Sequence, residues 1–242
     1  MVFRARTHGE SDKIITLLTR DFGKLTGIAK GALRSRRRFV ASLEPFTHVR
    51  LGFRSRAHGE LCFIESADIV RAARKLTFDL DRYAYSTYVV DLTDSLVEGR
   101  EADAATFDLV EEALALIDGC PSLPAPEWLR AFEIRLLALA GLEPRLESCG
   151  RCRAAIVDAN GPLQFNPRSG NLACRDCSDG AALAVSAEAL AAILGLRVGP
   201  VGPRAELPVR VATEARVLLQ TFIAHHVRRP LRSPALLREI LG

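Results

Sequence analysis

The chain has 242 residues, of which 48% are hydrophobic and 26% are charged, and its formal net charge at pH 7 is +4. These values are typical of a soluble globular protein. The longest apolar runs are far too short to span a bilayer, and the N-terminus lacks the apolar segment of a secretory signal, so we expect a cytoplasmic protein.

The charges are distributed unevenly along the chain. Residues 1–75 hold 16 Lys and Arg against 7 Asp and Glu, a net charge of +9. Residues 76–118 hold 2 basic and 11 acidic residues, a net charge of −9. A basic N-terminal part followed by an acidic part suggests a polyanionic partner for the first.

Five short segments in the first ~70 residues have strand character, with Gly at several of the turns between them. They are MVFRAR, DKIITLLTR, KLTGIAK, FTHVRLGF and GELCFIESADIV. The DFG triplet at residues 21–23 is typical of a hairpin turn. Five short strands predict a small barrel of the OB or the SH3-like type, and periodicity alone does not separate these two.

Four arginines crowd into residues 34–38, within the stretch AKGALRSRRRFVASLEPF. Most dense charge runs are solvated surface loops, which is one interpretation of this one. The other is a phosphate-binding loop on a nucleic-acid module, because guanidinium groups bind phosphates in bidentate fashion.

From about Asp79 the apolar spacing becomes helical. Apolar residues recur at helical intervals over residues 85–96, 107–117 and 128–139, and Gly141 is placed as a C-terminal helix cap. The proline-rich stretch at 120–127 separates the second and third of these helices. Pro208 is expected in the first turn of a further helix, and Ser233 begins a last short one.

Four cysteines form two Cys-x-x-Cys pairs separated by 21 residues: Cys149, Cys152, Cys174 and Cys177. Two such turns facing each other complete a tetrahedral metal site, so the spacing predicts a zinc ribbon or a related knuckle. Four thiolates leave no open coordination position, so the zinc is expected to be structural. Two disulfides are the alternative, which a cytosolic location disfavours.

The sequence contains no Walker loop, no G-x-G-x-x-G and no H-E-x-x-H motif. The carboxylates at 76–118 fit a solvated helix face better than a paired acid–base site. We therefore expect a protein that is not an enzyme.

Residues of three regions resemble the RecO family of bacterial recombination mediators. The N-terminal matches are Gly9, Glu10, Asp12, Leu17, Leu18, Thr19, Gly23, Lys24, Ala29, Lys30, Gly31, Arg34, Arg38 and the run 43–46. LRAFEIRLLALAGLEP at 129–144 resembles the family's central helix, and the paired cysteines resemble the zinc motif of many members. Members usually begin several residues before the position that matches Met1, and Leu33 stands where a basic residue is common.

The resemblance implies an α+β, multidomain fold with four parts. These are an OB-fold DNA-binding domain at 1–75, a helical domain at 76–145, a zinc-ribbon subdomain at 146–180 and helices at 181–242 that complete the helical domain. It also implies that the protein binds single- and double-stranded DNA and anneals complementary strands in DNA repair and recombination, as a nucleoid-associated protein of the cytoplasm. Its implied partners are RecR, RecF and the acidic tail of single-stranded DNA-binding protein, and with RecR it promotes loading of RecA.

The expected DNA-contacting residues are basic and lie in the first domain: Lys24, Lys30, Arg34, Arg36, Arg37, Arg38, Arg54 and Arg56. Phe39 and Phe53 are candidates for stacking on bases, with barrel core as the alternative for both. Arg130 and Arg135 are candidates for binding the acidic tail, with an ordinary salt bridge from Arg130 to Glu127 or Glu133 as the alternative.

Two other functions stay open at the level of the sequence. One is a zinc-ribbon and OB-fold scaffold in transcription or translation that binds RNA or proteins. The other is a zinc-dependent enzyme, which would need an open position on the metal.

Overall fold

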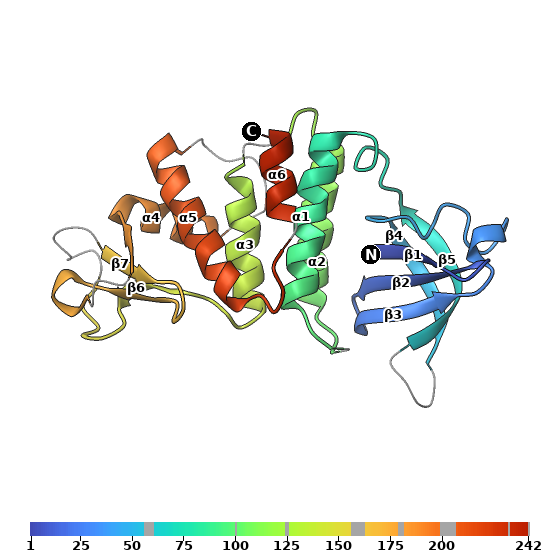
Figure 1. Ribbon diagram of the computed structural model, residues 1–242, viewed down its shortest axis with the longest axis horizontal. Helices are drawn as coiled ribbons and strands as arrows, with labels where there is room; N and C mark the ends of the chain where they lie inside the picture. The colour runs from blue at the N-terminus through green and yellow to red at the C-terminus, as the bar shows by residue number, and fades with distance from the viewer. Residues whose placement is uncertain are drawn as a thin grey trace. The chain divides into compact units, whose positions relative to one another are not determined.

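The computed structural model describes residues 1–55, 61–99, 101–123, 126–155, 163–178, 182–198, 207–231 and 233–241. The chain divides into two compact units. The first unit comprises Met1–Leu123 with Arg232–Gly242, and the second comprises Pro124–Leu231. Strands and helices occur in both, which confirms the predicted α+β class (Figure 1). In the part of the chain that the structure describes, no helix combines the length and apolar character that crossing a membrane requires.

A five-stranded sheet forms the N-terminal part of the first unit. Its strands are β1 (Val2–His8), β2 (Asp12–Thr19), β3 (Gly23–Ala29), β4 (His48–Arg54) and β5 (Leu61–Arg71), in the order β1-β2-β3-β5-β4. β3 and β5 run parallel, and the other neighbouring strands run antiparallel. The five strands predicted from the sequence are confirmed.

One face of the sheet carries the core of this part. Ile15 and Leu17 of β2 are buried and alternate with the more exposed Ile14 and Thr16, and Cys62 and Ile64 of β5 alternate with more exposed neighbours in the same way. The backbone of Gly27 lies so close to β5 that a Cβ there would stand 2.6 Å from the Cys62 sulfur. Glycine at this position therefore lets β3 and β5 pack closely.

The two edge strands, β1 and β4, approach each other at one end. The Val2 amide donates to the Thr47 carbonyl at 2.9 Å, and the Phe46 amide donates to the Val2 carbonyl at 2.8 Å. No β1–β4 ladder occurs among the strand pairings of the described residues. The sheet thus curls toward closure, and a fully closed OB barrel stays a prediction.

Three helices complete the first unit: α1 (Leu80–Leu96), α2 (Ala104–Gly119) and α6 (Ser233–Leu241). Asp79 caps α1 by accepting from the Arg82 amide at 3.1 Å, and Asp103 caps α2 by accepting from the Thr106 amide at 3.0 Å. The Ser233 hydroxyl donates to Asp91 of α1 at 3.0 Å, which ties the start of α6 to α1.

Carboxylates of α1 and α2 pair with basic side chains of the sheet. The Lys24 ammonium lies 3.2 Å from an oxygen of Asp94, and Arg4 lies 3.3 Å from the other oxygen. Arg20 donates to both carboxylate oxygens of Asp108, at 3.1 and 2.8 Å. Part of the positive charge of residues 1–75 is therefore matched within the unit.

His48 makes a further contact between the sheet and α2. Its Nδ1 lies 2.7 Å from Glu111, and its ring lies edge-on to Phe107 with centroids 5.4 Å apart. Burial lowers the pKa of His48, although the hydrogen bond to Glu111 acts in the opposite direction. The neutral ring therefore donates its Nδ1–H to the carboxylate at neutral pH.

The second unit holds helices α3 (Trp128–Leu139), α4 (Ala187–Leu196) and α5 (Val209–His226), and α3 contacts both others. Gly141, at φ +70°, ends α3 as predicted: its amide donates to Ala138 and the next amide donates to Leu137. Pro208 is the N-cap of α5, one residue before the expected first turn. The sequence analysis missed α4, whose signal is Ser186, an N-cap that accepts from the Ala189 amide.

A small four-stranded sheet accompanies these helices. Its strands are β6 (Arg145–Cys149), β7 (Leu163–Asn166), β8 (Asn171–Ala173) and β9 (Leu183–Val185), in the order β6-β8-β7-β9. The buried ring of Phe165 on β7 packs edge-on against Phe222 of α5, with centroids 5.9 Å apart. This contact joins the small sheet to the helical core of the second unit.

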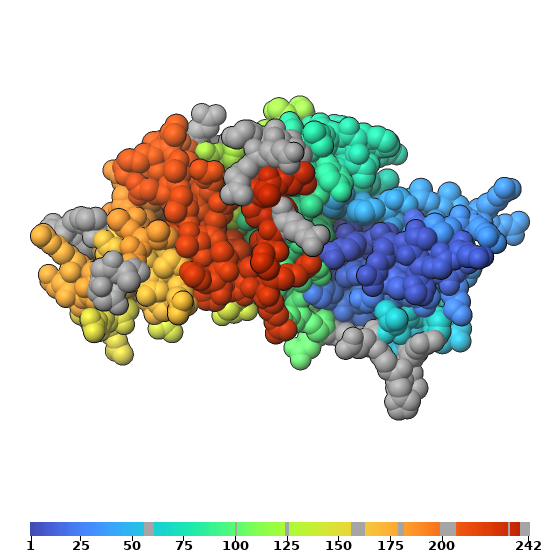
Figure 2. Space-filling model, in the orientation of Figure 1, coloured from blue at the N-terminus to red at the C-terminus, as the bar shows by residue number. Residues whose placement is uncertain are grey.

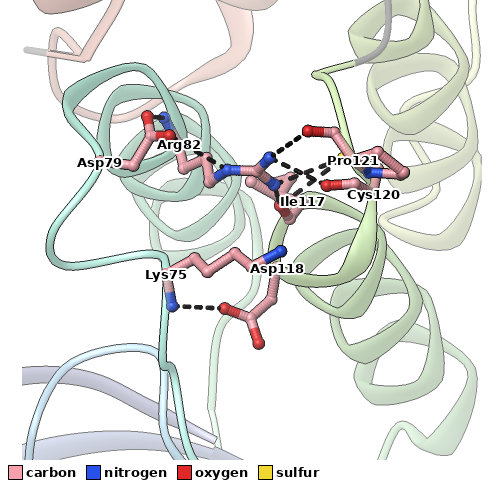
Figure 3. Close-up of polar contacts among 7 residues, drawn as sticks. All are labelled: Lys75, Asp79, Arg82, Ile117, Asp118, Cys120 and Pro121. Atoms are coloured by element: carbon pink, nitrogen blue, oxygen red, sulfur yellow. Dashed lines mark hydrogen bonds and ion pairs between the residues drawn. The ribbon is translucent and has the colours of Figure 1, made fainter.

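Arg82 of α1 binds the C-terminal end of α2 (Figure 3). Its guanidinium donates to the carbonyl oxygens of Ile117, of Cys120 at 2.9 Å and of Pro121 at 3.3 Å, and it also pairs with Asp79 at 3.2 Å. The side chain is buried, and the last carbonyls of a helix otherwise lack partners. Arg82 therefore serves as the C-terminal cap of a helix distant in sequence.

Arg82→Met should destabilise the protein by about 2–4 kcal/mol, because buried carbonyls lose a charged donor while the apolar stem of the side chain is kept. Urea denaturation measures the free energy of unfolding. Arg6→Ala, at an exposed position of β1, is the control and should change stability by under ~0.5 kcal/mol. Equal stabilities of the two variants would show that Arg82 does not cap α2.

Candidate nucleic-acid interface and metal centre

The connection between β3 and β4, residues 30–47, carries the four clustered arginines and a short helix, η1 (Ala32–Arg34). We name residues 30–38 the arginine loop. The Gly31 amide donates to Asp12 at 2.8 Å, and the Leu33 amide donates to the Ser11 carbonyl at 2.9 Å. The bond from Gly31 lowers the pKa of Asp12. The turn between β1 and β2 thus holds the start of the loop.

The end of the arginine loop is fixed to the core and to β5. Phe39 is 5% exposed and belongs to the core of the sheet. The Arg38 carbonyl accepts from the Ala67 amide of β5 at 3.2 Å, and the Arg38 amide donates to the Ser35 hydroxyl at 3.1 Å. The loop is therefore anchored at both ends, and its exposed side chains project from a fixed backbone.

Arg34, Arg36 and Arg37 are exposed and form no side-chain ion pair or hydrogen bond with any residue that the structure describes. Arg38 differs, because it donates to the Lys30 carbonyl at 2.9 Å and lies 5.0 Å from the Phe39 ring centroid. Three exposed guanidinium groups without a carboxylate partner are available to an external anion.

The remaining predicted DNA contacts have different surroundings. Lys30 is exposed, and its ammonium lies 5.6 Å from the ring centroid of Phe63. Lys24 and Arg54 are engaged by carboxylates, Asp94 and Glu65 respectively. Arg56 lies outside the described residues. Lys30 therefore lies at the start of the arginine loop, and Lys24 lies against α1.

Of the two alternatives for Phe39, core is confirmed and stacking on bases is not, because the ring is buried in the core. Phe53 is partly buried and packs edge-on against Phe22, with centroids 5.2 Å apart. The sequence analysis missed Phe22, which is 52% exposed in the β2–β3 turn, and the partly exposed Phe63. For Phe63 the signal was strand alternation, since it stands between buried Cys62 and Ile64.

The four predicted metal ligands lie together in the second unit. The sulfurs of Cys149, Cys152, Cys174 and Cys177 are all within 4.8 Å of one another, and those of Cys152 and Cys174 are 3.8 Å apart. Four sulfurs held ~2.3 Å from one ion at the corners of a tetrahedron stand ~3.8 Å apart. The cluster is therefore compatible with a metal ion bound by four thiolates.

The thiols have sharply different acidities. Burial by itself raises the pKa of Cys149, but backbone N–H donors from residues 151, 152 and 174 outweigh it and lower the pKa to about 6. Hydrogen bonding to the Cys174 thiol, with burial, raises the pKa of Cys177 to about 12. At neutral pH the cluster therefore keeps at least one proton until a cation replaces it.

Exposed arginines stand directly beside the cysteines in the sequence. They are Arg151, Arg153 and Arg175. Arg151 donates to the Cys177 carbonyl at 3.3 Å, which links the two Cys-x-x-Cys turns. A divalent ion with four thiolates carries two net negative charges, so these arginines offset the charge of the centre.

The two arginines expected to bind an acidic tail are both on α3. Arg130 is 4% exposed and pairs with Glu133, which is fully buried. This is the ordinary salt bridge that the sequence analysis gave as the alternative for Arg130. Arg135 is partly buried, and its Nη1 has no hydrogen-bond partner among the described residues. Of the two, Arg135 is the more exposed.

Comparison with known proteins gives matches over nearly the whole chain. The sequence profile described as "Recombination protein O N terminal" matches residues 1–73, and "Recombination protein O C terminal" matches residues 77–235. The relative named "DNA repair protein RecO" from Anaeromyxobacter dehalogenans (strain 2CP-C) is 38% identical over 244 residues, 99% of this chain and 94% of the relative. Proteins of the same name from Myxococcus xanthus and a Nocardioides species are 36% and 32% identical, over 99% and 97% of this chain and 96% of each relative.

Binding of Zn²⁺ to the chelator-treated protein at pH 7 should release at least one proton per ion, because Cys177 must lose its proton to become a ligand. Affinity should accordingly rise with pH. Isothermal titration calorimetry in buffers of different ionisation enthalpy measures the number of protons released.

Two variants control this titration. Cys174→Ser should lose tight binding, whereas Cys120→Ser, whose thiol lies outside the cluster, should bind Zn²⁺ like the unaltered chain. Binding without proton release, or binding that survives Cys174→Ser, would contradict a four-thiolate site.

Proposed function

Since the chain belongs to the RecO family of DNA repair proteins, we propose that it is a non-catalytic recombination mediator that binds single- and double-stranded DNA and anneals complementary single strands. With RecR it promotes loading of RecA on strands that single-stranded DNA-binding protein covers, and RecF is a further partner. It acts at the nucleoid, in the cytoplasm, during recombinational repair.

The observation that carries DNA binding is the contrast between paired and unpaired cations in the first unit. Arg4, Arg20 and Lys24 face carboxylates of α1 and α2, and the energy of a DNA contact there would be reduced by breaking those pairs. Arg34, Arg36 and Arg37 have no such competitor among the described residues. A phosphate therefore gains the most binding free energy at these three side chains.

The proposed DNA path centres on the arginine loop. Arg34, Arg36, Arg37 and Arg38 contact phosphates, and Lys30 extends the track toward the outer face of β3 and β5. Arg54, Arg56 and Lys24 are secondary contacts of the same path. Phosphate contacts carry no sequence information, which suits a protein that acts at any gap.

We propose that the metal is zinc and that its role is structural. A tetrahedral set of four cysteines is typical of structural zinc and leaves no position for a reacting water. The ion would join residues 149–152 to residues 174–177 within a small sheet whose strands have three to five residues. Such a sheet has little core of its own, so metal binding contributes to its folding.

We further propose that Arg130 and Arg135 form the site for the acidic tail of single-stranded DNA-binding protein. Arg135, the more exposed of the two, offers its guanidinium to a terminal carboxylate, whereas Arg130 is already paired with the buried Glu133. Arg135 is therefore the residue that contacts the tail directly.

Replacing Arg34, Arg36 and Arg37 together by Ala should weaken binding of all single-stranded sequences alike and flatten the salt dependence. Each phosphate contact contributes ~0.7 to the slope of log affinity against log salt, so the slope should fall by about 2. Fluorescence anisotropy of labelled oligonucleotides at several salt concentrations measures both quantities.

The matched control for the arginine loop is the double variant Arg4→Ala and Arg20→Ala, which removes cations that are already paired. It should leave the slope unchanged. If the triple variant has the same salt slope as the wild-type chain, the arginine loop is a solvated surface loop that does not contact DNA. Failure of the wild-type chain to anneal complementary DNA, with RNA or protein binding instead, would favour the scaffold alternative.

Arg135→Ala should weaken binding of a peptide from the acidic tail by about 10- to 100-fold, the cost of losing a hydrogen bond between charged groups. Arg216→Ala, an exposed arginine of α5 in the same unit, should bind the peptide like the wild-type chain. Calorimetric titration gives both affinities. If both variants bind as tightly as wild type, the tail docks elsewhere.

A further inference from the structure

Phe78, in the connection between β5 and α1, is 91% exposed. A fully exposed phenylalanine leaves its whole apolar surface in water, which costs free energy unless a partner covers it. The connection, residues 72–79, leads from the end of β5 to the N-terminal end of α1, and the arginine loop projects from the sheet away from that helix (Figure 1). The start of α1, teal-green in Figure 2, is uncovered on the face shown.

Hydrogen bonds hold the backbone around Phe78. The Lys75 amide donates to Asp118 of α2 at 2.8 Å, and the Lys75 carbonyl accepts from the amides of Phe78 and Asp79 at 3.2 and 3.1 Å. Asp79 caps α1 and pairs with Arg82, which binds the end of α2 (Figure 3). The exposed ring therefore stands on a turn that is fixed to two helices.

The fold does not use the Phe78 side chain. Phe78 directly precedes the N-cap Asp79, where an apolar residue often packs against the fourth residue of the helix, here Tyr83. The 91% exposure of Phe78 shows that this packing is absent. Tyr83 instead lies edge-on to Phe46, with centroids 5.8 Å apart.

The surroundings of Phe78 combine aromatic and basic character. Arg74 and Lys75 are exposed, and neither side chain forms an ion pair with a described residue. Of the nearby acids, Asp79 and Asp118 are engaged by the hydrogen bonds above, and Asp81 is exposed. An exposed ring beside two unpaired cations matches a base and its flanking phosphates.

We propose that residues 74–78 form a second contact for single-stranded nucleic acid, separate from the arginine loop. Phe78 stacks on a base, and Arg74 and Lys75 bind the phosphates on either side. The inference rests on the proposed DNA-binding function and adds a site to it. Two separate contacts on one unit suit an activity that handles two strands.

The test is equilibrium binding of an oligothymidylate long enough to reach both contacts, measured with the full chain at several salt concentrations. Phe78→Ala should weaken binding by about 5- to 100-fold, the range for loss of one base–aromatic stack. The salt slope should stay unchanged, because stacking releases no counterions. Replacing the arginine loop residues should instead flatten the slope, so the two contacts are separable.

Three further variants fix the chemistry. Phe78→Trp keeps a stacking face and should retain wild-type affinity, whereas Phe78→Leu keeps only apolar surface and should behave like Phe78→Ala. Val209→Ala is the control: Val209 is 83% exposed, and its neighbour Arg210 is paired with Glu214 at 2.8 Å. Val209→Ala should therefore not change the affinity for the oligothymidylate.

Two results would overturn the second contact while leaving the proposed function intact. One is wild-type affinity in Phe78→Ala, and the other is wild-type affinity in Phe78→Leu, which would show that the contact does not depend on an aromatic stack. A wild-type chain that binds no oligothymidylate would contradict the proposed function itself, and the second contact with it.

Discussion

Charge pairing inside the first unit is the constraint on which the rest of the structure depends. Carboxylates of α1 and α2 pair with Arg4, Lys24 and Arg20, which lie in the sheet or its turns, and Glu111 accepts a hydrogen bond from the neutral ring of His48. These contacts fasten the helices to one end of the sheet. They also make those cations less available to an external anion, whereas Arg34, Arg36 and Arg37 of the arginine loop have no such partner among the described residues.

Much of this architecture was predictable from the sequence, because each of these elements follows from a local sequence pattern that has a single structural explanation. Short segments of strand character between glycine-containing turns predicted the strands, and helical spacing with a glycine stop at Gly141 predicted α3. The two Cys-x-x-Cys pairs gave the thiolate cluster, since each pair closes one small turn. The resemblance of residues 9–46 to RecO proteins is confirmed by matches over nearly the whole chain.

Other features depend on contacts that local sequence does not encode. Nothing near Lys24 indicated that Asp94, 70 residues away, engages it, and burial of Phe39 follows from how the loop folds back on the core. The role of Arg82 likewise requires the end of α2 to lie beside α1. The sequence shows only that these side chains are charged or aromatic. Which of them can bind an external ligand depends on the residues that surround them in the fold.

The most direct test of the account is selective chemical modification of arginines by a dicarbonyl reagent, with and without saturating single-stranded DNA, read by mass spectrometry. Arg34, Arg36 and Arg37 should react readily in the free protein and be protected by DNA, because they are exposed and unpaired. Arg20, held by Asp108, should react slowly in both states. Full reactivity of the three loop arginines in the DNA complex would contradict the account.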